Sequence, residues 1–113
     1  MNTHVQVSTI TDSVTNENVR IDFLHMKKAS MILRALNHKL RQQMVKLLDE
    51  HKKMTVTEIY VKLRLEQSVA SQHLAILRRA GIVGTKREGK FIYYFINYVR
   101  VRDISYFVEE FLK

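Results

Sequence analysis

The stretch Ser68–Gly81 constrains the fold of this chain more than any other segment. It reads Ser-Val-Ala-Ser-Gln-His-Leu-Ala-Ile-Leu-Arg-Arg-Ala-Gly, with small polar side chains at its start and two arginines near its end. Its apolar residues recur at helical spacing, which predicts an amphipathic helix over residues 67–80. Gly81 then ends the helix, because glycine readily adopts the left-handed conformation that closes many helices.

A basic β-hairpin follows this helix. Residues 86–90 read Lys-Arg-Glu-Gly-Lys, and the side chains of residues 91–96 alternate as they do in a strand. We expect this strand to pair with residues 82–87 across a tight turn at Glu88-Gly89, so that residues 84–92 form the wing. A helix that leads at once into a charged two-stranded hairpin is typical of a winged helix-turn-helix.

Three more helices are predicted before this motif. Residues 19–36 form a helix whose apolar surface is wider than one stripe, and residues 39–50 form a second helix, with Asn37 as the cap between them. Thr55 and Glu58 form a capping box that begins a short third helix.

A turn at residues 64–66 separates the third helix from the helix over residues 67–80, which is the helix-turn-helix arrangement. Residues 98–113 form a last amphipathic helix. The predicted fold class is mainly α with a small β-hairpin, in the winged helix-turn-helix order α-α-α-α-β-β-α.

The charge of the chain suits a polyanionic partner. The net charge is +8, and residues 68–102 hold seven basic side chains against the single acid Glu88, so this part supplies +6 of it. A basic face next to a winged motif indicates nucleic-acid binding. The alternative, a solvated basic surface that binds nothing, stays open on charge alone.

The helix over residues 67–80 divides into two faces at 100° per residue. Its inner face carries Ala70, Leu74 and Leu77. Its outer face carries Ser68, Ser71, Gln72, Ala75 and Arg79. Small side chains let a helix approach the floor of the major groove, where Gln can pair with adenine and Ser can contact bases or phosphates. His73 points toward the inner face, so we interpret it as a buried or half-buried structural histidine with a hydrogen bond inside the motif, with contact to a base as the alternative.

Three cations bracket the tip of the hairpin: Lys86, Arg87 and Lys90. A cationic tip fits along a phosphate backbone or into a minor groove. The same charges also protect an edge strand from aggregation, and the two roles are compatible.

Together these residues resemble the ArsR-type (ArsR/SmtB) bacterial transcriptional repressors over about residues 33–96. The resemblance depends on Ala35-Leu36 with Arg41 and Lys46-Leu47-Leu48, on Gln67-Ser68-x-x-Ser71-Gln72-His73-Leu74, on Leu77-Arg78-x-Ala80-Gly81-Ile82-Val83, and on Arg87-Glu88-Gly89-Lys90 with Tyr93-Tyr94.

The resemblance implies a homodimer that represses transcription from a pseudo-palindromic operator in double-stranded DNA. It implies that Gln67, Ser68, Ser71 and Gln72 face the groove and that Arg87 and Lys90 are wing contacts. It also implies that the first and last helices pair between subunits, which accounts for their wide apolar faces. The residues expected at that interface are Phe23, Leu24, Ile32, Ile104, Phe107, Val108 and Phe111.

The chain departs from the family pattern at several positions. His38-Lys39 stands where Asp-Pro often opens the second helix, Arg64 replaces a turn glycine, and Glu66 is a poor cap for the helix that follows. Residues 55–65 hold no cysteine and no histidine follows His73, so the usual metal ligands are missing. We expect no metal and no cofactor. A zinc site between His4 or His25 and the partner subunit is the alternative.

Other function classes are less favoured by the sequence. The absence of cysteine excludes disulfides and thiolate sites, and the chain has no Gly-rich phosphate loop or nucleophile-base set, so we expect no enzyme. No apolar run is long enough to span a membrane and the first residues do not resemble a signal peptide, so we expect a cytoplasmic protein.

We expect residues 1–18 to be a flexible tail, with at most a short strand. Residues 19–113 are expected to form a single domain for DNA binding and dimerisation. The alternative function is a winged-helix module that binds an acidic protein, because a winged fold does not by itself specify DNA.

Overall fold

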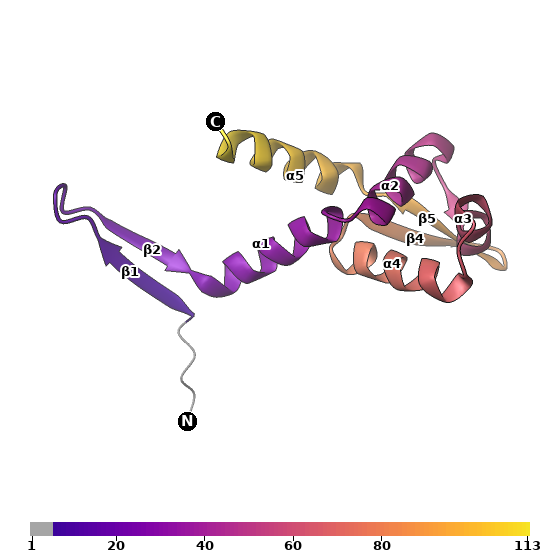
Figure 1. Cartoon of the computed structure of the whole chain (residues 1–113), viewed down its shortest axis with the longest axis horizontal. Coiled ribbons are helices and arrows are strands. Elements are labelled where there is room, and N and C mark those ends of the chain that lie inside the picture. The colour runs from indigo at the N-terminus through magenta and orange to yellow at the C-terminus, as the bar shows by residue number, and fades with distance from the viewer. Residues whose placement is uncertain (1–5) are drawn as a thin grey trace, which may run out of the picture. The chain divides into compact units, whose positions relative to one another are not determined.

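The computed structural model describes residues 6–113, and Figure 1 labels their helices and strands. By contact density the chain divides into two compact units, one ending at Ile32 and one from Leu33 to Lys113, with the boundary inside α1. The elements in chain order are β1 (Val7–Thr11), β2 (Asn18–Asp22), α1 (Phe23–Leu36), α2 (Lys39–His51), β3 (Met54–Thr55), α3 (Val56–Leu63), α4 (Gln67–Arg79), β4 (Val83–Glu88), β5 (Phe91–Ile96) and α5 (Tyr98–Phe111).

The second unit is a winged helix-turn-helix, as predicted. Its helices α2, α3 and α4 surround a core of fully buried side chains, and α4 contacts β4 while α2 contacts β5 (Figure 1). The largest of the buried side chains are Met44, Leu48, Ile59, Leu74, Leu77 and Ile82. The core therefore fixes α4 on the sheet through its apolar face, which leaves the polar face outside.

The sheet of this unit has a third strand that the sequence did not reveal. β3 pairs with β5 through Met54↔Tyr94 and Thr55↔Tyr93, so the strand order is β3-β5-β4. β5 is thus the central strand and is held on both edges.

The loop of the wing lies one residue later than predicted. Glu88 pairs with Phe91, which leaves Gly89 and Lys90 as the two loop residues. Gly89 has a φ of +63°, and a two-residue hairpin loop with glycine first needs this conformation. Glu88 is therefore a strand residue and not part of the turn.

The predicted ends of α3 and α4 are confirmed. The Glu58 amide donates to Thr55 Oγ1 over 3.2 Å and the Thr55 amide donates to Glu58 Oε1 over 2.8 Å, which completes the capping box. Gly81 follows α4 with a φ of +76°. The proposed cap at Asn37 is wrong, because it is His38 that caps α2: its Nδ1 accepts from the Leu40 amide over 3.2 Å.

The first unit corrects the prediction for the N-terminal part of the chain. β1 and β2 form an antiparallel hairpin where a tail with at most a short strand was expected, and α1 begins at Phe23 instead of residue 19. The Asp12 carboxylate accepts from the Val14 amide over 2.9 Å and shapes the loop. Residues 19–22 alternate apolar and polar side chains, and this period of two is that of a strand and not of a helix.

The junction between hairpin and helix has no linking residue. Asp22 ends β2, and its Oδ1 accepts from the His25 amide over 3.0 Å, so its carboxylate caps the first turn of α1. This bond lowers the pKa of Asp22. The Phe23 amide also donates to the Gln6 carbonyl over 2.6 Å. The hairpin is thereby tied directly to the start of α1.

Within residues 6–113, no helix has both the length and the apolar character needed to cross a membrane.

Candidate nucleic-acid interface

Helix α4 carries the predicted recognition face, which we define as Gln67, Ser68, Ser71, Gln72 and Arg79. All five of these residues are exposed. On the other side of the helix Ala70, Leu74 and Leu77 are completely buried. The structure therefore brings the predicted groove-facing residues together on one polar, accessible surface of α4.

The start of α4 has no side-chain cap. Glu66 occupies the N-cap position and its carboxylate accepts no hydrogen bond from the helix, as its residue type predicted. The preceding turn is closed by Arg64, which adopts a left-handed conformation with a φ of +56° where the family usually has glycine. The turn geometry is thus kept although its usual residue is absent.

His73 is half-buried and hydrogen-bonded, which confirms its interpretation as a structural residue. Arg41 Nη1 lies 3.1 Å from His73 Nδ1, and a guanidinium can only donate, so Nδ1 accepts and the ring proton sits on Nε2. Burial lowers the pKa of His73, and His38, whose ring centroid is 4.8 Å away, and Arg41 lower it further. His73 is therefore neutral when it fixes α4 against α2.

Arg41 is the one buried charged side chain of the described residues, with 7% of its surface exposed. Besides its bond to His73 it donates through Nε to the Ala35 carbonyl over 2.6 Å and through Nη2 to the Arg34 carbonyl over 3.3 Å. These carbonyls belong to the last turn of α1, where helical partners run out. Arg41 thus joins the ends of α1 and α2 to the recognition helix.

The wing, which consists of β4, β5 and their loop, exposes the three predicted cations Lys86, Arg87 and Lys90. Arg87 Nη1 donates to the Gly89 carbonyl over 3.4 Å, and Lys90 Nζ lies 5.5 Å from the centre of the Phe91 ring. These are weak local contacts, so the three charges remain available to a ligand.

Lys53 is a residue of the wing region that the sequence reasoning missed. Its Nζ donates to both carboxylate oxygens of Glu88, over 2.7 Å and 2.9 Å, and lies 4.7 Å from the centre of the Tyr93 ring. The pair lowers the pKa of Glu88 and raises that of Lys53. Lys53 thereby neutralises the only acid of the wing, and no local signal in the sequence connects two residues so far apart.

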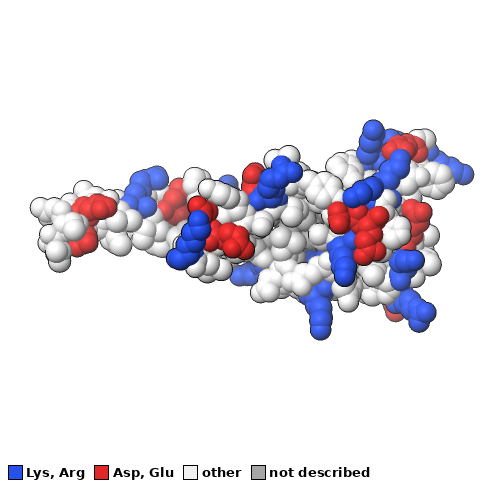
Figure 2. All heavy atoms as spheres, turned by 90° about the horizontal axis from the view of Figure 1, so that it is seen from above, with Lys and Arg blue, Asp and Glu red and all other residues white. Residues whose placement is uncertain are grey.

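The wing tip and the first turn of α4 point to the same end of the second unit (Figure 1). Figure 2 shows basic side chains projecting around the end of the molecule that carries α2, α3 and the wing. A polar helix end beside a cationic hairpin can contact base edges and phosphates at once.

The predicted dimer residues are exposed or half-buried. Phe23, Leu24, Phe107 and Phe111 are between 41% and 75% exposed. The other three, Ile32, Ile104 and Val108, are half-buried. Ala35 is the only buried residue of α1, and α5 has none. Both helices therefore present apolar surface that another chain can cover.

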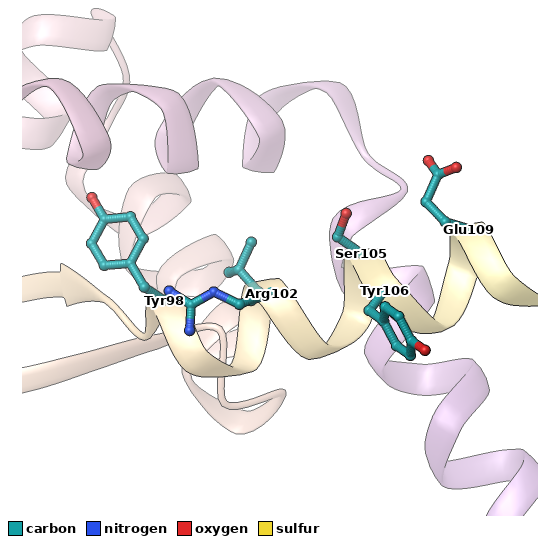
Figure 3. A pocket seen from close by; sticks show the side chains of 6 residues that line it. Tyr98, Arg102, Ser105, Tyr106 and Glu109 are labelled. Carbon is teal, nitrogen blue, oxygen red and sulfur yellow. The ribbon is translucent and has the colours of Figure 1, made fainter.

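An open groove runs along α5, on the side of the helix that faces away from Phe107 and Phe111. Figure 3 shows its lining side chains, among them Tyr98, Arg102, Ser105 and Glu109, all from α5 itself. The Tyr98 hydroxyl donates to Asp49 Oδ1 over 2.6 Å, which ties the start of α5 to α2 and lowers the pKa of Asp49. None of the residues that line the groove is among the predicted interface residues.

No group of three His, Asp or Glu side chains among residues 6–113 is arranged to hold a metal ion. His25 Nδ1 instead lies 3.2 Å from Asp22 Oδ2. His4, the other candidate zinc ligand, lies outside the described residues.

Known proteins resemble this chain in sequence and in fold. The family model for bacterial regulatory proteins of the arsR family matches residues 38–85. The transcriptional repressor PagR of Bacillus anthracis is 34% identical over 85 residues, which are 75% of this chain and 85% of PagR. The crystal structure of PagR matches with a TM-score of 0.59 and 34% identity, over 67% of this chain and 86% of that chain. The chain belongs to the ArsR family of bacterial regulatory proteins.

Two further relatives carry different names. The transcriptional activator HlyU of Vibrio cholerae is 36% identical over 75 residues, which are 66% of this chain and 68% of HlyU. The homodimeric winged helix-turn-helix DNA-binding domain of a possible ArsR-family regulator from Mycobacterium bovis matches with a TM-score of 0.65 and 25% identity, over 73% of this chain and 76% of that chain.

Membership of the ArsR family makes this chain a DNA-binding regulator of transcription, as predicted. The matched residues 38–85 contain the whole of α4 and therefore the recognition face. They end before Lys86, so the family match includes neither the wing cations nor the two predicted dimer helices, α1 and α5.

Proposed function

We propose that this ArsR-family regulator is a homodimer that represses transcription by binding a pseudo-palindromic operator. Helix α4 enters the major groove and the wing lies on the adjacent backbone or minor groove. The observation that carries the proposal is the recognition face itself, whose five polar side chains are all exposed on a helix that buries its other side in the core.

The side chains divide into two roles by their chemistry. Ser71 and Gln72 offer hydrogen-bonding groups of short reach near the start of α4, which suits contacts to base edges. Arg87 and Lys90 carry full charges on a hairpin tip, which suits phosphates and carries no sequence information. Specificity is therefore assigned to α4 and a large share of the affinity to the wing.

The homodimer is supported by the exposed apolar surfaces of α1 and α5 and by the homodimeric Mycobacterium bovis neighbour. A two-fold dimer places two recognition helices about one DNA turn apart, so the operator repeats in inverted order. Repression is supported by PagR, which is named a repressor, whereas HlyU is named an activator. A reporter gene placed behind the operator distinguishes repression from activation. If the protein is a repressor, deletion of its gene should raise expression of the reporter.

Substitutions test the division of roles. We expect Ser71→Ala and Gln72→Ala to reduce the ratio of operator to random-duplex affinity, with about 1–3 kcal/mol of discrimination lost at a good amide contact. Arg87→Ala should weaken both duplexes alike and reduce the salt slope by about 1, because one phosphate contact is lost. Gln43→Ala, an exposed glutamine of α2, is the matched control and should change neither quantity.

Binding is measured by fluorescence anisotropy on both duplexes over a range of salt concentrations. Equal losses on operator and random DNA for all three variants would contradict the assignment of specificity to α4. If the wild-type protein had no preference for any duplex, the alternative of a module that binds an acidic protein would be favoured instead.

A further inference from the structure

The hairpin of β1 and β2, which we call the arm, has one apolar and one polar face. Paired residues of an antiparallel hairpin share a face, and the register pairs Ile10 with Val19 and Ser8 with Ile21. Ile10, Val19 and Ile21 therefore form a single apolar face of the arm. Ile10 is 54% exposed and Val19 is 44% exposed, and Ile21 is half-buried.

The apolar face of the arm is not packed against another described element of its own unit, as a two-stranded hairpin needs for stability. An isolated hairpin is at best marginally stable in water, and an apolar face has to be packed against something else to stabilise it. The alternation that produces this face is regular over β2, where Val19 and Ile21 alternate with Arg20 and Asp22. The sequence thus specifies an apolar surface that the described residues of its own unit leave open to solvent.

The arm is continuous with a helix that also exposes apolar surface. Leu24 and Met31 lie on one side of α1, and Met26 and Leu33 lie on nearly the opposite side, because residues two apart on a helix point almost opposite ways. These four side chains are between 37% and 58% exposed. If α1 pairs with a helix of the partner subunit across a two-fold axis, one of these two sides becomes buried. The other side of α1 then remains exposed and can pack against another apolar element.

The charge of the arm argues against DNA as its ligand. Residues 6–22 hold three carboxylates, Asp12, Glu17 and Asp22, against the single cation Arg20, which gives −2 in a chain of net charge +8. The rest of the chain therefore carries +10. An acidic arm is repelled by a phosphate backbone and attracted by a basic protein surface, which a second copy of this chain provides.

We propose that the arm is a dimerisation element: its apolar face of Ile10, Val19 and Ile21 packs on α1 of a second copy of the chain. The inference rests on the homodimer of the proposed function and extends its interface beyond α1 and α5. In a two-fold dimer each arm covers the partner's helix, so every arm contact occurs twice. The direct joining of β2 to α1 brings the arm to the same interface as the helix.

The double variant Ile10→Thr/Val19→Thr tests the packing. Threonine keeps the β propensity of both strands and makes the arm face polar. Because each substitution counts twice in a symmetric dimer, we expect the dimer Kd from sedimentation equilibrium to rise about tenfold or more. The matched control is Thr9→Ser/Thr11→Ser, two exposed residues on the opposite face whose substitution leaves the charge of the arm unchanged, which should leave the Kd within about twofold.

A second measurement does not depend on any variant folding. In a dimer assembled from isotope-labelled and unlabelled wild-type chains, intermolecular nuclear Overhauser effects are expected between the methyl groups of Ile10 or Ile21 and the methyl groups of α1, such as those of Met26 or Leu33. Their absence from a dimer that forms normally would overturn the proposal, as would an unchanged Kd for the double variant.

The proposal for the arm and the proposal of a homodimer can be refuted separately. If wild-type protein stays monomeric at every concentration and on DNA, both this inference and the homodimer of the proposed function are wrong. If the wild type is a dimer that Phe107→Asp disrupts while Ile10→Thr/Val19→Thr does not, the arm proposal is wrong and the proposed function stands.

Discussion

Replacing the buried Arg41 by methionine should destabilise the fold, because three hydrogen bonds are lost at once. The substitution keeps the apolar stem and removes three donated bonds, to the carbonyls of Ala35 and Arg34 and to Nδ1 of His73. The Ala35 bond is the strongest of these, because it is 2.6 Å long and buried. A hydrogen bond to a charged group contributes about 1.5–3 kcal/mol, and a buried acceptor left unpaired costs about 1–3 kcal/mol.

The net cost is smaller than the sum of these terms. Water can replace Arg41 at the less buried acceptors on Arg34 and His73, and burying a guanidinium is itself unfavourable. We therefore expect Arg41→Met to lower the free energy of unfolding by about 2 kcal/mol. At about 2.1 cal/mol/K per residue the unfolding entropy of a chain of this size is about 0.24 kcal/mol/K, so Tm should fall by about 8 °C.

The matched control is Gln42→Met. Gln42 Nε2 donates to the Leu36 carbonyl over 2.8 Å at the same end of α1, but this bond is exposed. We expect a loss of about 0.5 kcal/mol, or about 2 °C. Both variants are measured by calorimetry and by urea denaturation at one protein concentration, because dimerisation shifts Tm. If Arg41→Met cost no more than Gln42→Met, the assignment of Arg41 as the residue that joins α1, α2 and α4 would be wrong.

Two further predictions concern His73 and the wing. Burial lowers the pKa of His73 in the folded protein, so as the pH falls the unfolded chain binds a proton at this position first. The contribution of neutral His73 to folding stability is therefore complete above the ordinary histidine pKa of about 6.5 and is lost as the pH falls below it. Urea denaturation between pH 7.5 and 5 should show that the free energy of unfolding falls with pH less steeply in His73→Gln than in the wild type, by up to about 1.4 kcal/mol per pH unit. Equal pH slopes in the two proteins would contradict the burial of a neutral His73. Glu88→Gln removes the acid of the wing and frees the ammonium of Lys53, so binding to random duplex should strengthen severalfold and its salt slope should steepen by about 1. Stability should change by less than about 1 kcal/mol, because this ion pair is partly exposed. Weaker DNA binding by Glu88→Gln would mean that the ion pair is needed to position the wing.

The parts of the fold that could be predicted from the sequence are those formed by residues close together in the chain. The two faces of α4, the Thr55–Glu58 capping box and the left-handed Gly81 each depend on residues within a few positions of one another. The fold class follows from the same signals, because a helix-turn-helix with a hairpin directly after it leaves few other arrangements.

The parts that the sequence did not predict depend on distant partners or on ambiguous periodicity. β3 exists only because Met54 and Thr55 pair with β5, and Lys53 meets Glu88 through the same folding of the chain. The arm was missed for another reason. Val19, Ile21, Phe23 and Leu24 satisfy a strand period and a helix period at once, and the carboxylate of Asp22 decides where one ends and the other begins.

Selection of bound duplexes from a random DNA pool tests the central claim most directly, because it assumes no operator. We expect enrichment of an inverted repeat whose half-sites are about one DNA turn apart, and loss of that enrichment when Ser71 and Gln72 are both replaced by alanine. Enrichment of no motif by the wild-type protein at moderate salt, or an equal enrichment by the double alanine variant, would contradict the claim that α4 reads the sequence.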